Sequence, residues 1–265
     1  MRPFLFHIGS TGVPAFFFMI MIGSLAATYV AAKIAKREGL SEIAVLDMAI
    51  IMIIASMIGS RLFHVFIEAP DYYWEKPIRV FFFWQGGFVS LGAFIGSILS
   101  AWAYLRIKKL NVARYLDVMA GAVPVIIFFV RWGCFLNGCC YGKETTHWPS
   151  VVFTNPSSTA CLMHYCNKML HPTQLYFAAN AIVMFIVLLL VRKYRKFYGQ
   201  VGAAFLMYEG FSRFFIEFLR GDGDRGIWFD GLLSTGQIVM VGFFAAGIVM
   251  WWMCGKRKPV CSADL

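Results

Sequence analysis

Long apolar segments separated by short polar links are the main feature of the hydrophobic pattern. Seven such segments occupy residues 12–33, 43–66, 88–105, 116–136, 173–191, 201–219 and 233–254. Each has roughly 18–24 residues, which is enough for a helix to cross a hydrocarbon core of about 30 Å. We therefore predict an all-α integral membrane protein with about seven transmembrane helices.

Composition leads to the same fold class. The chain has 265 residues, of which 60% are hydrophobic and only 14% are charged. A soluble domain of this length could not remove so much apolar surface from water. No internal repeat or long linker suggests a second domain, so we expect residues 1–265 to form a single polytopic membrane domain. The longest polar stretch, residues 137–172, is expected to be a loop on the outer face.

The basic residues lie on alternate links. More than half of the 24 lysines and arginines follow the first, third, fifth and seventh segments. They are Lys33, Lys36, Arg37, Arg106, Lys108, Lys109, Arg114, Arg192, Lys193, Arg195, Lys196, Lys256, Arg257 and Lys258. By the positive-inside rule these links are cytoplasmic, which places the N-terminus outside and the C-terminus inside. The net charge of +10 is therefore a topology signal, and we expect no nucleic acid as a partner.

Four charged residues share one stripe of the sixth segment. They are Glu209, Arg213, Glu217 and Arg220. With spacings of four, four and three residues, they fall within roughly 80° of one another on an α-helix. Lipid cannot solvate such a stripe, which must therefore face the bundle interior or a polar cavity. It can be a structural ion-pair ladder that holds helices together, or it can be part of an anion site.

A second intramembrane cation favours the anion site. Arg131 ends an apolar stretch and is the second residue of the segment VRWGCFLNGCCYG, residues 130–142. Intramembrane charges mark functional sites by default, and guanidinium groups bind phosphate with bidentate geometry. In this setting the obvious anion is a phospholipid headgroup. Arg61, near the outer end of the second segment, is a third candidate, although an arginine there can also snorkel to the interface.

The segment VRWGCFLNGCCYG resembles the signature of prolipoprotein diacylglyceryl transferases, and three further motifs stand in the expected order along the chain. They are WQGGFVSLGAFIG (84–96), HPTQLY (171–176), and EGFSRFFIEFLRGD (209–222) followed by STGQI (234–238). The resemblance implies a multi-pass enzyme of the bacterial inner membrane. Such an enzyme transfers diacylglyceryl from phosphatidylglycerol to the signal-sequence cysteine of an exported prolipoprotein and releases glycerol phosphate. We expect neither a cofactor nor a metal.

The resemblance also implies roles for individual residues. Arg131 and Arg213 match the arginines that hold the donor headgroup, and Glu217 matches a polar residue beside them. These three are the candidate catalytic residues. The candidate substrate-binding residues are Arg61, Asn137, Gly138, Gly142, His171, Gln174, Glu209 and Arg220.

The chain departs from the family pattern at four positions. Leu91 stands where family members commonly have a histidine, and Phe16 replaces a tyrosine of the first segment. Within the signature, Cys134 and Cys139 stand in place of an asparagine and an acidic residue. The headgroup arginines are kept while the histidine is not, so Glu217 becomes the main candidate for a base or an orienting group.

Four cysteines lie in the expected outer loop. They are Cys139, Cys140, Cys161 and Cys166. Because disulfides persist outside the cytoplasm, pairing the first two with the last two would tie the loop down, at about 3 kcal/mol per bridge. A zinc-like site with His147, His164 or His171 and a catalytic thiol are the alternatives, although the spacing matches no standard metal pattern.

Two functions other than an enzyme remain open. A protein that kept the headgroup site and lost catalysis would bind or translocate phospholipid. A membrane thiol–disulfide protein would use Cys139 and Cys140. Turnover of a lipid donor distinguishes the first from an enzyme, and thiol trapping in whole cells tests the second.

Overall fold

The computed structural model describes residues 2–8, 11–82, 87, 89–221, 227–228 and 233–256. Most of the regular structure in these residues is helical. The chain divides into two compact units, and each forms its own set of contacts. The first comprises Met1–Ala31 and Leu116–Leu265, and the second comprises Ala32–Tyr115.

Seven helices of 17 or more residues in the described part of the chain correspond to the seven apolar segments. They are α1 (Ala15–Arg37), α2 (Glu42–Phe63), α4 (Ser90–Ile107), α5 (Val112–Asn137), α7 (Thr173–Lys193), α8 (Gln200–Ile216) and α9 (Thr235–Gly255). Five helical stretches are long and apolar enough to cross a membrane, namely α1, α2 with its extension to Glu68, α5, α7 and α9. The prediction of an all-α membrane protein is thus confirmed, while the number of spans stays a prediction.

Short elements join the long helices. The hairpin of β1 (Phe4–Ile8) and β2 (Thr11–Pro14) precedes α1. Between α2 and α4 lie η1 (His64–Glu68), α3 (Pro70–Glu75) and η2 (Pro77–Phe81). The loop after α5 contains β3 (Val151–Val152), α6 (Thr159–Leu162) and β4 (Met169–Leu170), with β3 and β4 paired antiparallel. Finally, η4 (Glu217–Leu219) continues α8, and β5 (Ile227–Trp228) pairs with β6 (Leu233–Ser234) before α9.

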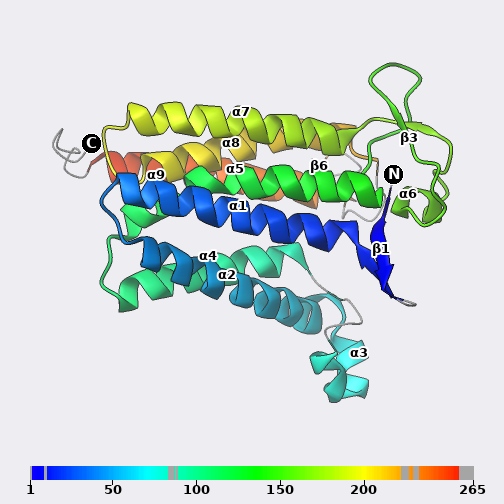
Figure 1. Cartoon of the computed structure of the whole chain (residues 1–265), viewed down its shortest axis with the longest axis horizontal. Coiled ribbons are helices and arrows are strands. Elements are labelled where there is room, and N and C mark those ends of the chain that lie inside the picture. Colours follow the sequence, from blue (N-terminus) through cyan, green and yellow to red (C-terminus); the bar gives the residue numbers. More distant parts are fainter. Residues whose placement is uncertain are drawn as a thin grey trace. The chain divides into compact units, whose positions relative to one another are not determined.

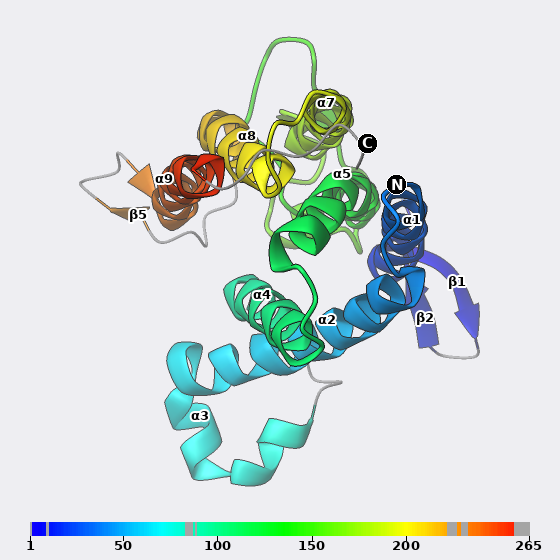
Figure 2. The same ribbon diagram turned by 90° about the vertical axis from the view of Figure 1, so that its left-hand side faces the viewer.

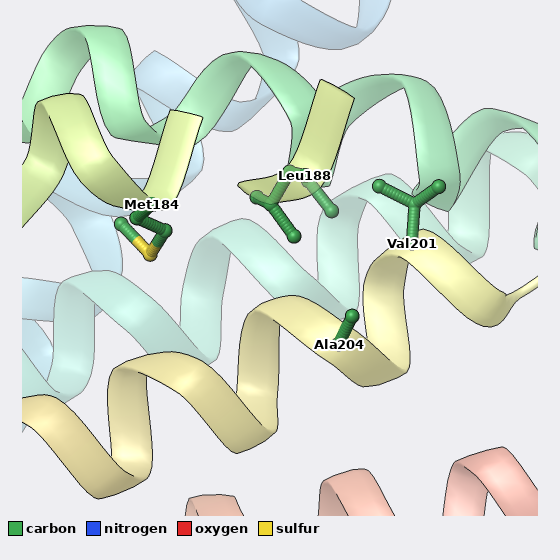
Figure 3. Close-up of a cluster of buried hydrophobic side chains, with 5 residues drawn as sticks. Met184, Leu188, Val201 and Ala204 are labelled. Atoms are coloured by element: carbon green, nitrogen blue, oxygen red, sulfur yellow. The ribbon is translucent and has the colours of Figure 1, made fainter. Parts of the chain in front are cut away.

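In the first unit α8 lies between α7 and α9 (Figure 2), and α5 packs against α7 and α8. The loop after α5 and the last turn of α9 lie at opposite ends of these helices (Figure 1). A cluster of buried apolar side chains joins α5, α7 and α8 (Figure 3). Its members are Ala120, Met184, Leu188, Val201 and Ala204. Because Ala120 and Ala204 are small, the helices approach closely at this level, as is typical of helix packing in membranes.

Asp117 fixes the start of α8 against α5. Its fully buried carboxylate accepts the backbone N–H groups of Gly199 at 2.8 Å and Gly202 at 2.9 Å. The first N–H groups of a helix have no partner within the helix, and a carboxylate also interacts favourably with the positive end of the helix dipole. The charge of Asp117 is therefore explained by helix capping.

In the second unit α2 packs closely on α4 through glycines. A side-chain carbon added at Gly59 would lie 2.5 Å from the carbonyl oxygen of Gly92 and 3.2 Å from the Cα of Gly96. Real carbon atoms do not approach a backbone oxygen so closely, so the two helices can keep this separation only with glycine at position 59. Small residues at a helix–helix interface serve this purpose in membrane proteins.

We expect Gly59→Ala to destabilise the second unit. The added methyl group must push α4 away from α2, and overpacking of this kind costs about 1–3 kcal/mol. The matched control is Gly242→Ala in α9, where no atom lies within 4 Å of the added carbon. That control should be neutral or stabilising by up to about 1 kcal/mol, because alanine is the better helix former. Thermal unfolding of both variants in detergent measures the difference, and equal melting temperatures would contradict the packing argument.

Candidate functional site

Arg131 lies in the last two turns of α5 and is a nearly buried cation. The residue is only 8% exposed, and its guanidinium carbon lies 4.2 Å from the centre of the Phe177 ring of α7. Among the residues that the structure describes, no carboxylate lies within ion-pair distance of Arg131. The face of an aromatic ring attracts a cation, but it does not neutralise the charge.

Arg213 of α8 approaches the same aromatic ring. Its guanidinium carbon lies 5.7 Å from the centre of the Phe177 ring, and its Nη1 lies 3.4 Å from Oε1 of Glu209, one turn earlier in α8. Arg131 and Arg213, predicted as partners from separate segments, are therefore brought together around Phe177. Two cations this close repel each other, and Arg213 has a carboxylate partner while Arg131 has none among the described residues.

The second ion pair joins Glu217 to Arg220. Nη1 of Arg220 lies 3.3 Å from both carboxylate oxygens of Glu217, which is 5% exposed. The predicted stripe differs here from a single helix face, because α8 ends at Ile216 and the next three residues form the tighter helix η4. A tighter helix places residues three apart in line, so Glu217 pairs with Arg220. Its carboxylate also faces the start of α9, where a side-chain carbon added at Gly236 would lie 3.2 Å from Oε1.

The backbone around Gly142 ties three motifs together. The N–H of Gly142 donates to the carbonyl of His171 at 2.9 Å, and the N–H of Lys143 donates to the carbonyl of Leu219 at 2.9 Å. An added carbon at Gly142 would lie 2.5 Å from Cβ of His171. The glycine is thus required by the close approach of two neighbouring backbones. Close packing therefore explains why position 142 is a glycine. The Nδ1 atom of the His171 ring lies 3.2 Å from the Tyr176 hydroxyl oxygen.

The start of α7 holds the two adjacent cysteines in place. Thr173 and Gln174, both fully buried, donate hydrogen bonds of 2.7 Å to the carbonyl oxygens of Cys140 and Cys139. The amide oxygen of Gln174 is buried and has no hydrogen-bond partner within the described residues. Gln174, predicted as a substrate-binding residue, therefore uses its amide nitrogen to position the signature backbone and leaves one buried acceptor open.

Asn137 and Gly138 shape the turn that follows α5. Nδ2 of Asn137 donates to Oγ1 of Thr159 at 3.1 Å, and the carbonyl of Gly138 accepts the N–H of Ala160 at 3.0 Å. Gly138 has φ +74°, a left-handed conformation that favours glycine. Both residues were predicted to bind substrate, and the contacts that the structure provides for them are with the loop around α6.

The cysteines differ from the predicted pairing. Cys161 and Cys166 form a disulfide with each other, while Cys139 and Cys140 remain thiols. The expectation that the bridges cross from the first pair to the second is therefore wrong. The physical reason is the turn after α5, which directs Cys139 and Cys140 back toward Cys134.

Three thiols gather at the end of α5, and sequence reasoning did not find this cluster. The sulfur atoms of Cys134, Cys139 and Cys140 all lie within 4.8 Å of one another. Hydrogen bonds from the Cys134 and Cys139 thiols, followed by the charges of Arg131 and Arg220, lower the pKa of Cys140 well below its ordinary value. The left-handed turn at Gly138 was the available signal, since it reverses the chain directly after the helix.

Arg61 belongs to the second unit, where its guanidinium group binds backbone carbonyls. It donates to the oxygens of Arg79 at 2.7 Å, Val80 at 3.1 Å, Phe82 at 3.2 Å and Gly87 at 3.3 Å. These bonds hold the connection between α2 and α4. Residues 84–86 and 88 of the motif WQGGFVSLGAFIG, the side chain of Leu91, and Asp222 lie outside the described residues.

Comparison with known proteins covers almost the whole chain. The model of the prolipoprotein diacylglyceryl transferase family matches residues 3–253. A phosphatidylglycerol–prolipoprotein diacylglyceryl transferase of Clostridium tetani is 32% identical over 259 residues, which cover 97% of this chain and all of that protein. Proteins of the same name from Clostridioides difficile and Enterococcus faecalis are 33% and 30% identical, over 93% and 94% of this chain and 93% and 89% of their own lengths.

The match over residues 3–253 agrees with the family that the signature and the order of the motifs suggested. The chain belongs to the prolipoprotein diacylglyceryl transferase family.

Proposed function

We propose that this chain transfers diacylglyceryl from phosphatidylglycerol to the signal-sequence cysteine of an exported prolipoprotein. The observation that carries the proposal is the nearly buried Arg131, which shares the Phe177 ring with Arg213 and has no carboxylate partner among the described residues. An isolated buried charge is expensive, so the site favours an anion. The relatives at 30–33% identity are named for this phospholipid donor and this protein acceptor.

The charge balance at the site fits a phosphodiester. The guanidinium groups of Arg131, Arg213 and Arg220 are accompanied by the carboxylates of Glu209 and Glu217. Among these described arginines and glutamates one positive charge remains, and the phosphodiester of phosphatidylglycerol carries one negative charge. In our proposal Arg131 and Arg213 bind the phosphate, and the two glutamates orient the neighbouring arginines.

The proposed reaction forms one bond and breaks another. The acceptor sulfur attacks the terminal glycerol carbon of the diacylglyceryl group, the bond from that carbon to the phosphate oxygen breaks, and glycerol phosphate leaves with the electron pair. As the bond breaks, a second negative charge develops on the phosphate, and preorganised cations stabilise a charge that develops in the transition state. The thiol must lose its proton to react. Glu217 has both oxygens engaged by Arg220, so we assign it an orienting role and leave His171 as the candidate base.

The proposal includes the membrane topology. We propose seven spans, with α4 and α8 added to the five stretches that are long and apolar enough to cross. The N-terminus then lies outside and the C-terminus in the cytoplasm of a bacterium, and the enzyme acts at the outer leaflet of the inner membrane. The basic ends of α1, α4 and α7 support this orientation by the positive-inside rule.

Arg131 and Arg213 together form the proposed phosphate clamp, and alanine at either position should remove most turnover. Truncating one member of a desolvated charge pair costs about 2–5 kcal/mol, and each 1.4 kcal/mol is about tenfold in rate. Arg131→Ala and Arg213→Ala should therefore each lose on the order of 30- to 5000-fold. Arg213→Lys keeps the charge but loses the planar fork, so its rescue should be partial. The measurement is transfer from labelled phosphatidylglycerol to a peptide with a lipoprotein signal cysteine, with the product identified by mass.

The matched control for the clamp is Arg37→Ala, an exposed arginine in the last turn of α1, which should keep full turnover. Thermal unfolding in detergent must be measured beside turnover. Near-wild-type turnover in both alanine variants would contradict the role of Arg131 and Arg213 as a phosphate clamp. Loss of folding in both variants would favour a structural ion-pair ladder. Donor binding without any turnover in the wild type would instead identify a phospholipid-binding protein that has lost catalysis.

Labelling with a membrane-impermeant thiol reagent tests the topology. Single cysteines introduced at the exposed positions Thr146, Lys109 and Lys196 place one probe on the loop after α5 and two on basic links. Relative to the parent chain, whole cells should show added labelling only for the variant at Thr146. External labelling at Lys109 or Lys196 in intact cells would reverse the proposed orientation.

A further inference from the structure

The cluster of Cys134, Cys139 and Cys140 is the feature that the transferase reaction leaves unexplained. These three residues form the one group of three or more metal-ligand side chains found in the described part of the chain. The transferase reaction requires a thiol on the acceptor protein, and needs no thiol of the enzyme. We therefore considered what three converging sulfur atoms in this position can bind.

The backbone is arranged so that the sulfurs converge. Cys134 is 4% exposed and lies in the last turn of α5, whereas Cys139 and Cys140 follow the turn at Gly138. Cys140 has φ +56°, a left-handed conformation that is uncommon for any residue other than glycine. Such a conformation persists only where the surroundings impose it. Here the buried Thr173 and Gln174 impose it through their hydrogen bonds to the carbonyls of Cys140 and Cys139.

The sulfur spacing is close to that of a metal–thiolate centre. All three sulfur atoms lie within 4.8 Å of one another. A metal–sulfur bond of about 2.3 Å separates sulfurs on one ion by roughly 3.8–4.0 Å, so side-chain adjustments of about 1 Å or less close the site. The loop disulfide joins Cys161 to Cys166 and leaves these three cysteines as thiols.

The number and the type of the ligands select the kind of ion. No histidine, aspartate, glutamate or further cysteine of the described residues joins the group as a fourth ligand, whereas structural zinc sites have four. Soft thiolate ligands favour Cu(I), which is commonly three-coordinate with thiolates.

We propose that Cys134, Cys139 and Cys140 form a three-thiolate binding site for one Cu(I) ion. Binding replaces the three thiol protons by the metal, so these protons are released. The site adjoins the arginine clamp but does not depend on it for its test, because the readout is metal content. The expectation from the sequence that the chain binds no metal would then be wrong at this position.

The experiment uses the purified full-length protein in detergent, with ascorbate to keep copper as Cu(I) and a sulfonated Cu(I) chelator as competitor. The wild type should retain about one equivalent of copper. Serine at position 134, 139 or 140 removes one ligand. Even the loss of a residue that only hydrogen-bonds to a metal ligand lowers metal affinity about 10- to 100-fold. Each serine variant should therefore bind Cu(I) on the order of 100-fold or more weakly. The matched control is Cys254→Ser, which changes a buried cysteine of α9 that lies outside the cluster and should bind copper as the wild type does.

Alkylation of the wild type keeps the test valid if a serine variant fails to fold. Cu(I) should protect Cys134, Cys139 and Cys140 from a thiol reagent and leave the reaction of Cys254 unchanged, as read by peptide mass. Copper retention equal to that of the Cys134→Ser, Cys139→Ser, Cys140→Ser triple variant would overturn the proposal. Equal alkylation with and without Cu(I) would overturn it as well.

Discussion

The nearly buried charge of Arg131 is the constraint on which the rest of the first unit depends. A guanidinium group in a poorly hydrated place costs several kcal/mol unless an anion compensates it. The Phe177 ring supplies a cation–π contact, which is worth about 2 kcal/mol or somewhat more when desolvated. That is less than the cost, so the folded protein holds a charge that it does not itself neutralise within the described residues. A bound phosphate would complete the balance.

The surrounding elements keep this uncompensated charge in place. Phe177 lies one turn after Gln174, whose side chain is bonded to the carbonyl of Cys139. The signature backbone is in turn bonded to His171 and to Leu219 through Gly142 and Lys143. The ends of α5, α7 and α8 are therefore fixed to one another by main-chain and side-chain hydrogen bonds near the arginines. Preorganisation of this kind lets cations act on a developing charge without first having to move.

Sequence reasoning located the helices and the charged stripe, but it could not show the contacts that surround the arginines. The lengths of the apolar segments predicted the seven long helices of the described residues, because a helix exposed to lipid requires a long apolar stretch. The spacing of the charges in α8 identified Glu209 and Arg213 as a pair. It could not show that α8 tightens after Ile216, because this depends on how η4 meets the start of α9. In the same way, Arg61, Gln174 and Gly142 were candidates for substrate contact, and their observed partners are backbone atoms, which leave no mark in a sequence pattern.

The cysteines show why the local charge has to be considered as a whole. At position 139 this chain has a cysteine where the family resemblance leads us to expect an acidic residue, so the carboxylate that could have stood near Arg131 is missing. The adjacent Cys140 has its pKa lowered, first by hydrogen bonds from the other two thiols and then by Arg131 and Arg220. Because thiolates bind soft metals, the cysteine that stands at position 139 in place of an acidic residue provides the proposed copper site with one of its three ligands.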